Sequence, residues 1–156
     1  MDNPFEGLKR EPDFETRAAS SVQERKLLEE MRLQKRDLLY NTYAPMVNEI
    51  LDQLIAAYRP DLWKRDSACE DLYCCHVRWF AGPEEKFHDP YVEHHVVRRV
   101  IEVELEQNKD CDPFGFKITN HEVLNRIIHV GLTKDELIRG IKEAFIVPVA
   151  IKPVAA

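Results

Sequence analysis

The sequence predicts a single α+β domain in which a long N-terminal helix precedes a three-stranded antiparallel meander and a C-terminal helical hairpin. A chain of 156 residues, 44% of them hydrophobic, is long enough to bury one core and short for two. Apolar residues recur at helical spacing between Ser21 and Tyr58, and they alternate with polar residues at three places between 72 and 118.

Neither end of the chain shows the helical spacing or the strand alternation of apolar residues. Residues 1–20 mix Pro4, Gly7 and Pro12 with scattered charges, and so little apolar surface does not offset the entropy of ordering. We therefore expect a disordered arm over 1–20, a domain over 21–147 and a loose tail over 148–156, where Pro148 and Pro153 prevent a helix.

The predicted helix runs from about Ser21 to Tyr58. Pro45 has no N–H to donate inside a helix but fits a first turn, so we expect a kink or a new start near this residue. The second half carries a broad apolar stripe that suits a core. Its members are Met46, Val47, Ile50, Leu51, Leu54, Ile55 and Tyr58.

Three strands are predicted from alternation. In 72–80 one face carries Tyr73, Cys75, Val77 and Trp79, and Ala81-Gly82-Pro83 is expected to end the strand. The stretch 91–107 also fits a helix, but from 101 onward apolar residues alternate strictly with glutamates, which favours a strand. Turn residues at 108–113 and alternation over 114–118 then predict an antiparallel hairpin.

Two short helices are expected to close the domain. Thr119 with Glu122, and Thr133 with Glu136, have the spacing of a capping box, in which a hydroxyl and a carboxylate satisfy free N–H groups at a helix start. A turn at Gly131 separates the two helices, which gives the segment 120–146 the outline of a helix-turn-helix.

Charge and composition limit the function. The net charge of −6 disfavours a protein whose main task is to grip nucleic acid or an anionic membrane. No stretch approaches the roughly 20 apolar residues of a membrane helix, and Met1 to Arg17 does not resemble a signal peptide. We expect a cytoplasmic protein with reduced thiols at Cys69, Cys74, Cys75 and Cys111.

One alternative function is DNA binding by a regulator that uses the segment 120–146. Its exposed donors would be Lys134, Arg139 and Lys142. Acidic residues balance these charges, and Asp135 and Glu136 open the would-be recognition helix, where they repel phosphates. An ordinary helical hairpin that covers the sheet explains the same pattern.

A metal site is not predicted, and no cofactor is expected. Thiols and imidazoles gather around the first two strands, but without the usual two-residue spacing of a zinc site. Neighbours in a strand point to opposite faces, so pairs such as Cys74 and Cys75 cannot readily share one ion. The group comprises Cys69, Cys74, Cys75, His76, His88, His94 and His95.

A second alternative function is a small acid/base or metal-dependent enzyme. It would use the glutamate face of the second strand together with nearby histidines, and it requires Glu104 and a histidine within hydrogen-bond reach in a cleft. The face consists of Glu102, Glu104 and Glu106, and the candidate partners are His76, His88, Asp89 and Glu93. A glutamate row is also typical of the solvent face of a half-buried sheet.

The favoured function is a non-catalytic protein-interaction or regulatory module. No cofactor loop or recognisable nucleophile appears, whereas amphipathic helical surface is plentiful. A protruding first half of the long helix would expose a large apolar patch, which a second copy would cover, so we expect a homodimer besides an unknown protein partner. The contact residues would be Leu27, Leu28, Met31, Leu38 and Leu39. Alternatively, this half folds back over the sheet.

Overall fold

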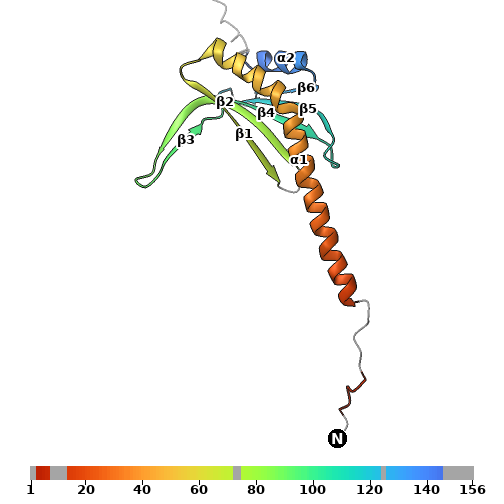
Figure 1. Cartoon of the computed structure of the whole chain (residues 1–156). Helices are drawn as coiled ribbons and strands as arrows, with labels where there is room; N and C mark the ends of the chain where they lie inside the picture. Colours follow the sequence, from red (N-terminus) through yellow and green to blue (C-terminus); the bar gives the residue numbers. More distant parts are fainter. Residues whose placement is uncertain (1–2, 8–13, 72–74, 124–125, 146–156) are drawn as a thin grey trace, which may run out of the picture.

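The computed structural model describes residues 3–7, 14–71, 75–123 and 126–145. Within them lie a long helix α1 (Phe14–Tyr58), six strands and a short helix α2 (Lys134–Phe145) (Figure 1). The strands are β1 (Trp63–Asp71), β2 (Cys75–His88), β3 (Glu93–Val97), β4 (Ile101–Gln107), β5 (Pro113–Asn120) and β6 (Arg126–Val130). None of the described helices is long and apolar enough to cross a membrane.

All strand pairs are antiparallel, and the main sheet has the order β1-β2-β4-β5-β6. The far half of β2 leaves this sheet and pairs with β3, which forms a separate two-stranded ribbon (Figure 1). Gly82 lies where β2 passes from the sheet into the ribbon, and a Cβ at this position would overlap the carbonyl oxygen of Arg98. The absence of a side chain therefore permits this passage.

The predicted three-stranded meander is wrong, because the described residues form six strands, five in the main sheet and β3 paired with β2 in the ribbon. β1 went undetected since its residues that face the helices include Arg65 and Ser67, which gives an edge strand no apolar alternation. The stretch 91–107 divides into β3 and β4, and Ala81-Gly82-Pro83 lies inside β2 instead of ending it. The β4–β5 hairpin forms as predicted.

The predicted C-terminal helical hairpin is also wrong, because its first member is strand β6. Ile127, Ile128 and Val130 fit a helical stripe, but β-branched side chains suit a strand, and β5 offers a free edge to pair with. The described residues of 120–146 therefore form no helix-turn-helix. At Thr133 the hydroxyl cap is confirmed, because the hydroxyl accepts from the N–H of Glu136 at 3.2 Å. The carboxylate of Glu136 accepts from this hydroxyl at 3.1 Å. Thr119 lies within β5.

α1 starts at Phe14, earlier than Ser21, and it is continuous through the exposed Pro45. The expected new start does not occur, and Figure 1 shows the C-terminal part of the helix running at an angle to the rest. The prediction of a disordered arm over 1–20 is wrong for residues 14–20, which belong to α1. Residues 4–7 form turns, while residues 1–2 and 8–13 of the predicted arm, the residues Tyr73 and Cys74, and the predicted tail at 148–156 lie outside the described residues.

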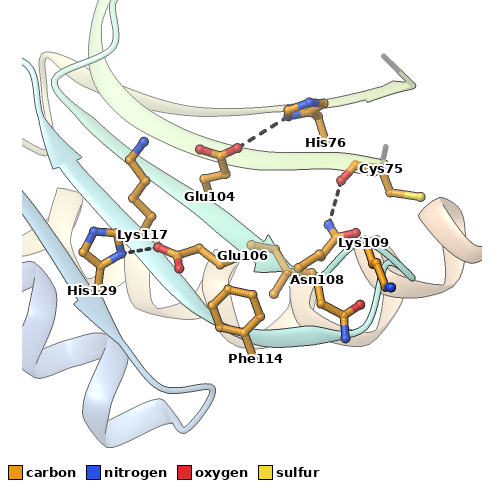
Figure 2. A pocket seen from close by; sticks show the side chains of 11 residues that line it. Cys75, His76, Glu104, Glu106, Asn108, Lys109, Phe114, Lys117 and His129 are labelled. Atoms are coloured by element: carbon orange, nitrogen blue, oxygen red, sulfur yellow. Dashed lines mark hydrogen bonds and ion pairs between the residues drawn. The ribbon is translucent and has the colours of Figure 1, made fainter. Parts of the chain in front are cut away.

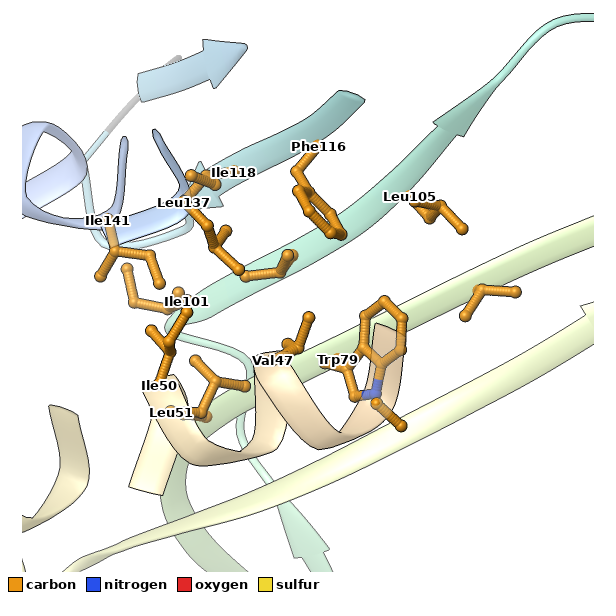
Figure 3. Packing of buried hydrophobic residues seen from close by; sticks show 14 of the residues in the cluster. Val47, Ile50, Leu51, Trp79, Ile101, Leu105, Phe116, Ile118, Leu137 and Ile141 are labelled. Atoms are coloured by element: carbon orange, nitrogen blue, oxygen red, sulfur yellow. The ribbon is translucent and has the colours of Figure 1, made fainter. Parts of the chain in front are cut away.

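Both helices cover the same face of the sheet. α1 lies over β1 and β2, while α2 lies over β5 and β6. The core between them is closed by large side chains that are fully buried, among them Trp79 and Phe116 (Figure 3). Tyr40 of α1 stacks on Trp79, and Tyr43 meets Phe116 edge-on, both at 5.7 Å between ring centroids.

Asn120, at the end of β5, is the one polar residue among the described residues that is fully enclosed in the core. Its Nδ2 donates to the carbonyl oxygen of Ala144 at 2.9 Å, and its Oδ1 accepts from the N–H of Glu122 at 3.0 Å. Arg126 donates to the carbonyl oxygen of Glu143. Two side chains from the sheet thus satisfy carbonyl groups at the C-terminus of α2.

We expect the substitution Asn120→Ala to lower the free energy of unfolding by about 1–3 kcal/mol, because it leaves a buried carbonyl and a turn N–H without partners. Urea unfolding followed by circular dichroism measures the change. Asn41→Ala, at an exposed position of α1, serves as the control and should leave stability nearly unchanged. An equal effect of the two substitutions would contradict this role of Asn120.

Candidate functional site

The face of the sheet that carries no helix, here called the open face, bears the side chains that alternate with the core. On β4 these are Glu102, Glu104 and Glu106, all half-buried. The core side of the same strand bears Ile101, Val103 and Leu105, all buried. The predicted glutamate row therefore exists, and it lies at the centre of the sheet, between β2 and β5.

Each glutamate of this row is bonded to a different histidine. Glu104 lies 3.4 Å from Nδ1 of His76 on β2, and Glu102 lies 2.9 Å from Nε2 of His121. Glu106 forms a short hydrogen bond with Nδ1 of His129 on β6. Of the predicted partners, His76 takes part, whereas His88, Asp89 and Glu93 belong to the β2–β3 ribbon and its turn.

Two arginines complete the charge balance around the row. Arg78 donates to Glu70 at 2.9 Å and to Glu102 at 3.4 Å. Arg99 approaches Glu102 at 3.5 Å and lies over the ring of Phe80, 4.6 Å from its centroid. These contacts give Glu102 three cationic or imidazole neighbours, so this end of the row is a closed network.

The other end of the row opens into a pocket of about 480 Å³. Figure 2 shows Glu104 and Glu106 at its centre, His129 and Lys117 on one side, His76 on the other and Phe114 along the edge. A volume of this size is typical of a site for a small molecule. The pocket is also lined by Cys75, Leu105, Gln107, Asn108 and Lys109.

Two polar groups of this pocket are left without protein partners. Oε1 of Gln107 is buried and has no hydrogen bond within the described part of the chain, although its Nε2 donates to the carbonyl oxygen of Cys75 at 2.7 Å. Lys117 stands opposite Glu104 in the β4–β5 register, but both nearby glutamates are bonded to histidines. Among the described residues it forms no ion pair.

A carboxylate bonded to Nδ1 of an imidazole fixes one tautomer and leaves Nε2 as a proton acceptor. Glu106 and His129 have this arrangement, and the His129 side chain is 64% exposed at the pocket. The site therefore combines an imidazole nitrogen that can accept a proton with the ammonium group of Lys117. The sequence alone did not single out His121, His129, Lys117, Phe114 or Gln107, because only the pairing of β4 with β2 and β5 brings them together.

No group of three or more histidine, cysteine or acidic side chains within the described residues is placed to hold a metal ion. Cys75 is buried on the core side of β2, whereas His76 points to the open face. His94 and His95 lie in the ribbon. Burial raises the pKa of Cys69, which disfavours the thiolate that a metal requires. Cys74 lies outside the described residues.

The N-terminal part of α1 projects from the body of the protein (Figure 1). Every residue from 17 to 31 is exposed, so this part does not fold back over the sheet. The predicted contact residues divide: Leu39 is buried in the core, whereas the other four are more than half exposed. These are Leu27 at 57%, Leu28 at 65%, Met31 at 56% and Leu38 at 65%.

The helix leaves the body at a defined anchor. Lys35 donates to the carbonyl oxygen of Asp110 at 2.6 Å and to the carboxylate of Asp112 at 3.0 Å, both in the β4–β5 loop. Next to it, the thiol of Cys75 donates to the carbonyl oxygen of Arg32 at 3.4 Å. The hydrogen bond raises the pKa of Lys35 and lowers the pKa of Asp112.

This anchor makes a contribution to stability that depends on pH. Because the pKa of Asp112 is lowered on folding, the contribution is present above the ordinary value of 3.8 and is lost as the pH falls through the lowered pKa. The raised pKa of Lys35 acts oppositely, so its contribution is lost only above 10.5. We expect Asp112→Asn to reduce the urea midpoint slightly at neutral pH.

The difference between this variant and the natural protein should shrink below the ordinary pKa of aspartate and vanish once Asp112 is protonated. Asp61→Asn, in an exposed turn, controls for the change in net charge. A difference that stays constant through the acid range would show that the anchor is not ionic.

The three predicted DNA-contacting residues lie on α2, but the acids of the chain engage two of them. Lys134 is bonded to Glu49 of α1 at 3.3 Å, and Arg139 approaches Glu143 at 3.9 Å. Lys142 is exposed in the last turn. Since β6 replaces the first helix of the motif, these residues are not presented as a helix-turn-helix presents them.

The β2–β3 ribbon carries further exposed apolar surface that the sequence analysis did not identify. Phe87 is 58% exposed, Tyr91 is 91% exposed and Val92 is 46% exposed. The sequence predicts a break at Ala81-Gly82-Pro83 and one strand over 91–107. Neither prediction indicates a separate ribbon.

Comparison with protein-family models, with curated protein sequences and with solved structures finds no match for this chain. Its function must therefore be inferred from the described residues themselves.

Proposed function

We propose that this protein is a non-catalytic interaction or regulatory module that self-associates through the projecting part of α1. One observation carries the proposal: the whole segment 17–31 is exposed, and it includes large apolar side chains. A helical segment without tertiary contacts is marginally stable in water, and most helices are held by the packing of an apolar face. The segment gains such packing when a second copy covers it.

Three exposed apolar residues and one glutamine of α1 have the spacing of a coiled-coil seam. Leu27, Met31 and Leu38, with Gln34 between the last two, are separated by four, three and four residues, which matches alternating d and a positions. At 3.6 residues per turn they lie on the side of α1 opposite Val47 and Leu51, which face the core. We call these four residues the outer stripe.

This geometry favours two parallel helices related by a two-fold axis. The stripes then face each other across the two-fold axis. Glu30 and Asp37 flank the stripe at g positions, where an antiparallel arrangement would set acids against acids. The commonest oligomer is a symmetric dimer.

We also place the protein in the cytoplasm. Cys69, Cys75 and Cys111 carry free thiols in the described structure, as is usual in a reducing compartment.

Sedimentation equilibrium of the full chain tests self-association. We expect a concentration-dependent dimer, and we expect Leu27→Glu and Met31→Glu each to raise its dissociation constant by more than about tenfold, because each removes a buried apolar side chain worth ~1.5–3 kcal/mol. Both residues are exposed in the monomer and lie outside the core, so the near-ultraviolet circular dichroism of the buried Trp63 and Trp79 should stay unchanged.

Phe87→Glu is the matched control, since it places the same charge at an equally exposed apolar residue of the ribbon. A natural chain that remains a monomer, or a dimer that survives both helix substitutions and is lost with Phe87→Glu, would refute the proposal. Orientation is read from oxidative cross-linking: Met31→Cys should link two parallel copies, whereas Arg25→Cys, on another side of α1, should not.

A further inference from the structure

The open-face pocket contains two glutamates and two lysines. Each glutamate has a histidine partner, Glu104 with His76 and Glu106 with His129. The lysines, Lys117 and Lys109, form no ion pair within the described residues. Their ammonium groups are therefore the charged donors of the pocket that remain for a ligand.

Lys117 is placed for this role by the sheet. It stands on β5 with Glu104 on one neighbouring strand and His129 on the other, directly opposite both. Figure 2 shows the Lys117 side chain beside Glu106 and His129, on one side of the pocket that it lines.

The edge of the pocket provides a flat apolar surface. Phe114 is 59% exposed, although it is the first large aromatic residue of β5 and the next one, Phe116, is fully buried in the core. An exposed ring beside a pocket favours stacking with another flat group. Gln107 adds a buried acceptor, Oε1, without a protein donor, and leaving such an atom unpaired costs free energy.

We propose that this pocket binds a small aromatic carboxylate that also carries a hydroxyl or N–H donor. The carboxylate meets Lys117, the aromatic ring stacks on Phe114, and the donor satisfies Oε1 of Gln107. The volume of about 480 Å³ accommodates such a molecule. No residue of the outer stripe lines the pocket, so this inference is independent of self-association and extends beyond it.

Titration of the isotope-labelled full chain with 4-hydroxycinnamate, 4-hydroxybenzoate and indole-3-acetate tests the proposal by amide chemical shifts. We expect at least one of these acids to cause saturable shifts that centre on residues 104–109 and 114–117. The neutral analogue 4-hydroxycinnamyl alcohol, which lacks the carboxylate, should bind at least about tenfold more weakly than its acid, since it forfeits a charge-assisted hydrogen bond.

Lys117→Met retains the aliphatic stem and should weaken binding of the acid by about tenfold or more, while Lys117→Arg should restore much of it. Lys64→Met, at an exposed position of β1 outside the pocket, is the matched control and should bind normally. The amide spectrum of each variant verifies its fold.

The proposal is overturned by any of three results: no saturable shift with all three acids, equal binding of the alcohol and its acid, or equal binding by Lys117→Met and the natural chain. Shifts confined to the ribbon, where Phe87, His88 and His94 line another pocket, would place the ligand elsewhere and overturn it equally.

Discussion

The packing of α1 against β2 is the contact on which the rest of the structure depends. Trp79 is fully buried and stacks on Tyr40, while Val47 and Leu51 of the helix occupy the same core. Because α2 covers β5 and β6 on the same side, all described helical cover lies on one face. The strand side chains that point away from the core therefore lie on the open face, which no described helix covers.

This constraint explains why polar residues on the open face pair with each other. A carboxylate beside a central strand is half-buried by its neighbours, and such a group gains from nearby donors. The β-register determines which donors reach it: His76 from β2 and His129 from β6 approach Glu104 and Glu106 across the row. The pocket forms where this pairing stops short of the β4–β5 loop.

Local patterns in the sequence predict only part of this arrangement. The alternation in β4, the β4–β5 hairpin and the Thr133 capping box were predicted because each is encoded by residues close in sequence. β1 and β6 were not, since Arg65 and Ser67 conceal one edge strand and the helical spacing of Ile127 and Ile128 conceals the other. Pairing with a neighbouring strand decided both, and that information is not local. The glutamate row was identified because its residues lie on one strand. Lys117 and His129 were not, because they come from other strands.

The β4–β5 loop connects two parts of the molecule that are otherwise separate. Asn108 accepts from the N–H groups of Asp110 and Asp112, which closes the loop around Cys111 in a left-handed conformation with φ of 62°. One side of this loop holds Lys35 of α1, and the other contributes Asn108 and Lys109 to the pocket. Any rearrangement of the loop therefore alters the rim of the pocket and the exit of the helix together. For the proposed ligand and the proposed dimer, thermodynamic linkage requires that a ligand that favours one loop conformation changes the affinity between helices by the same factor by which pairing of the helices changes the affinity for that ligand.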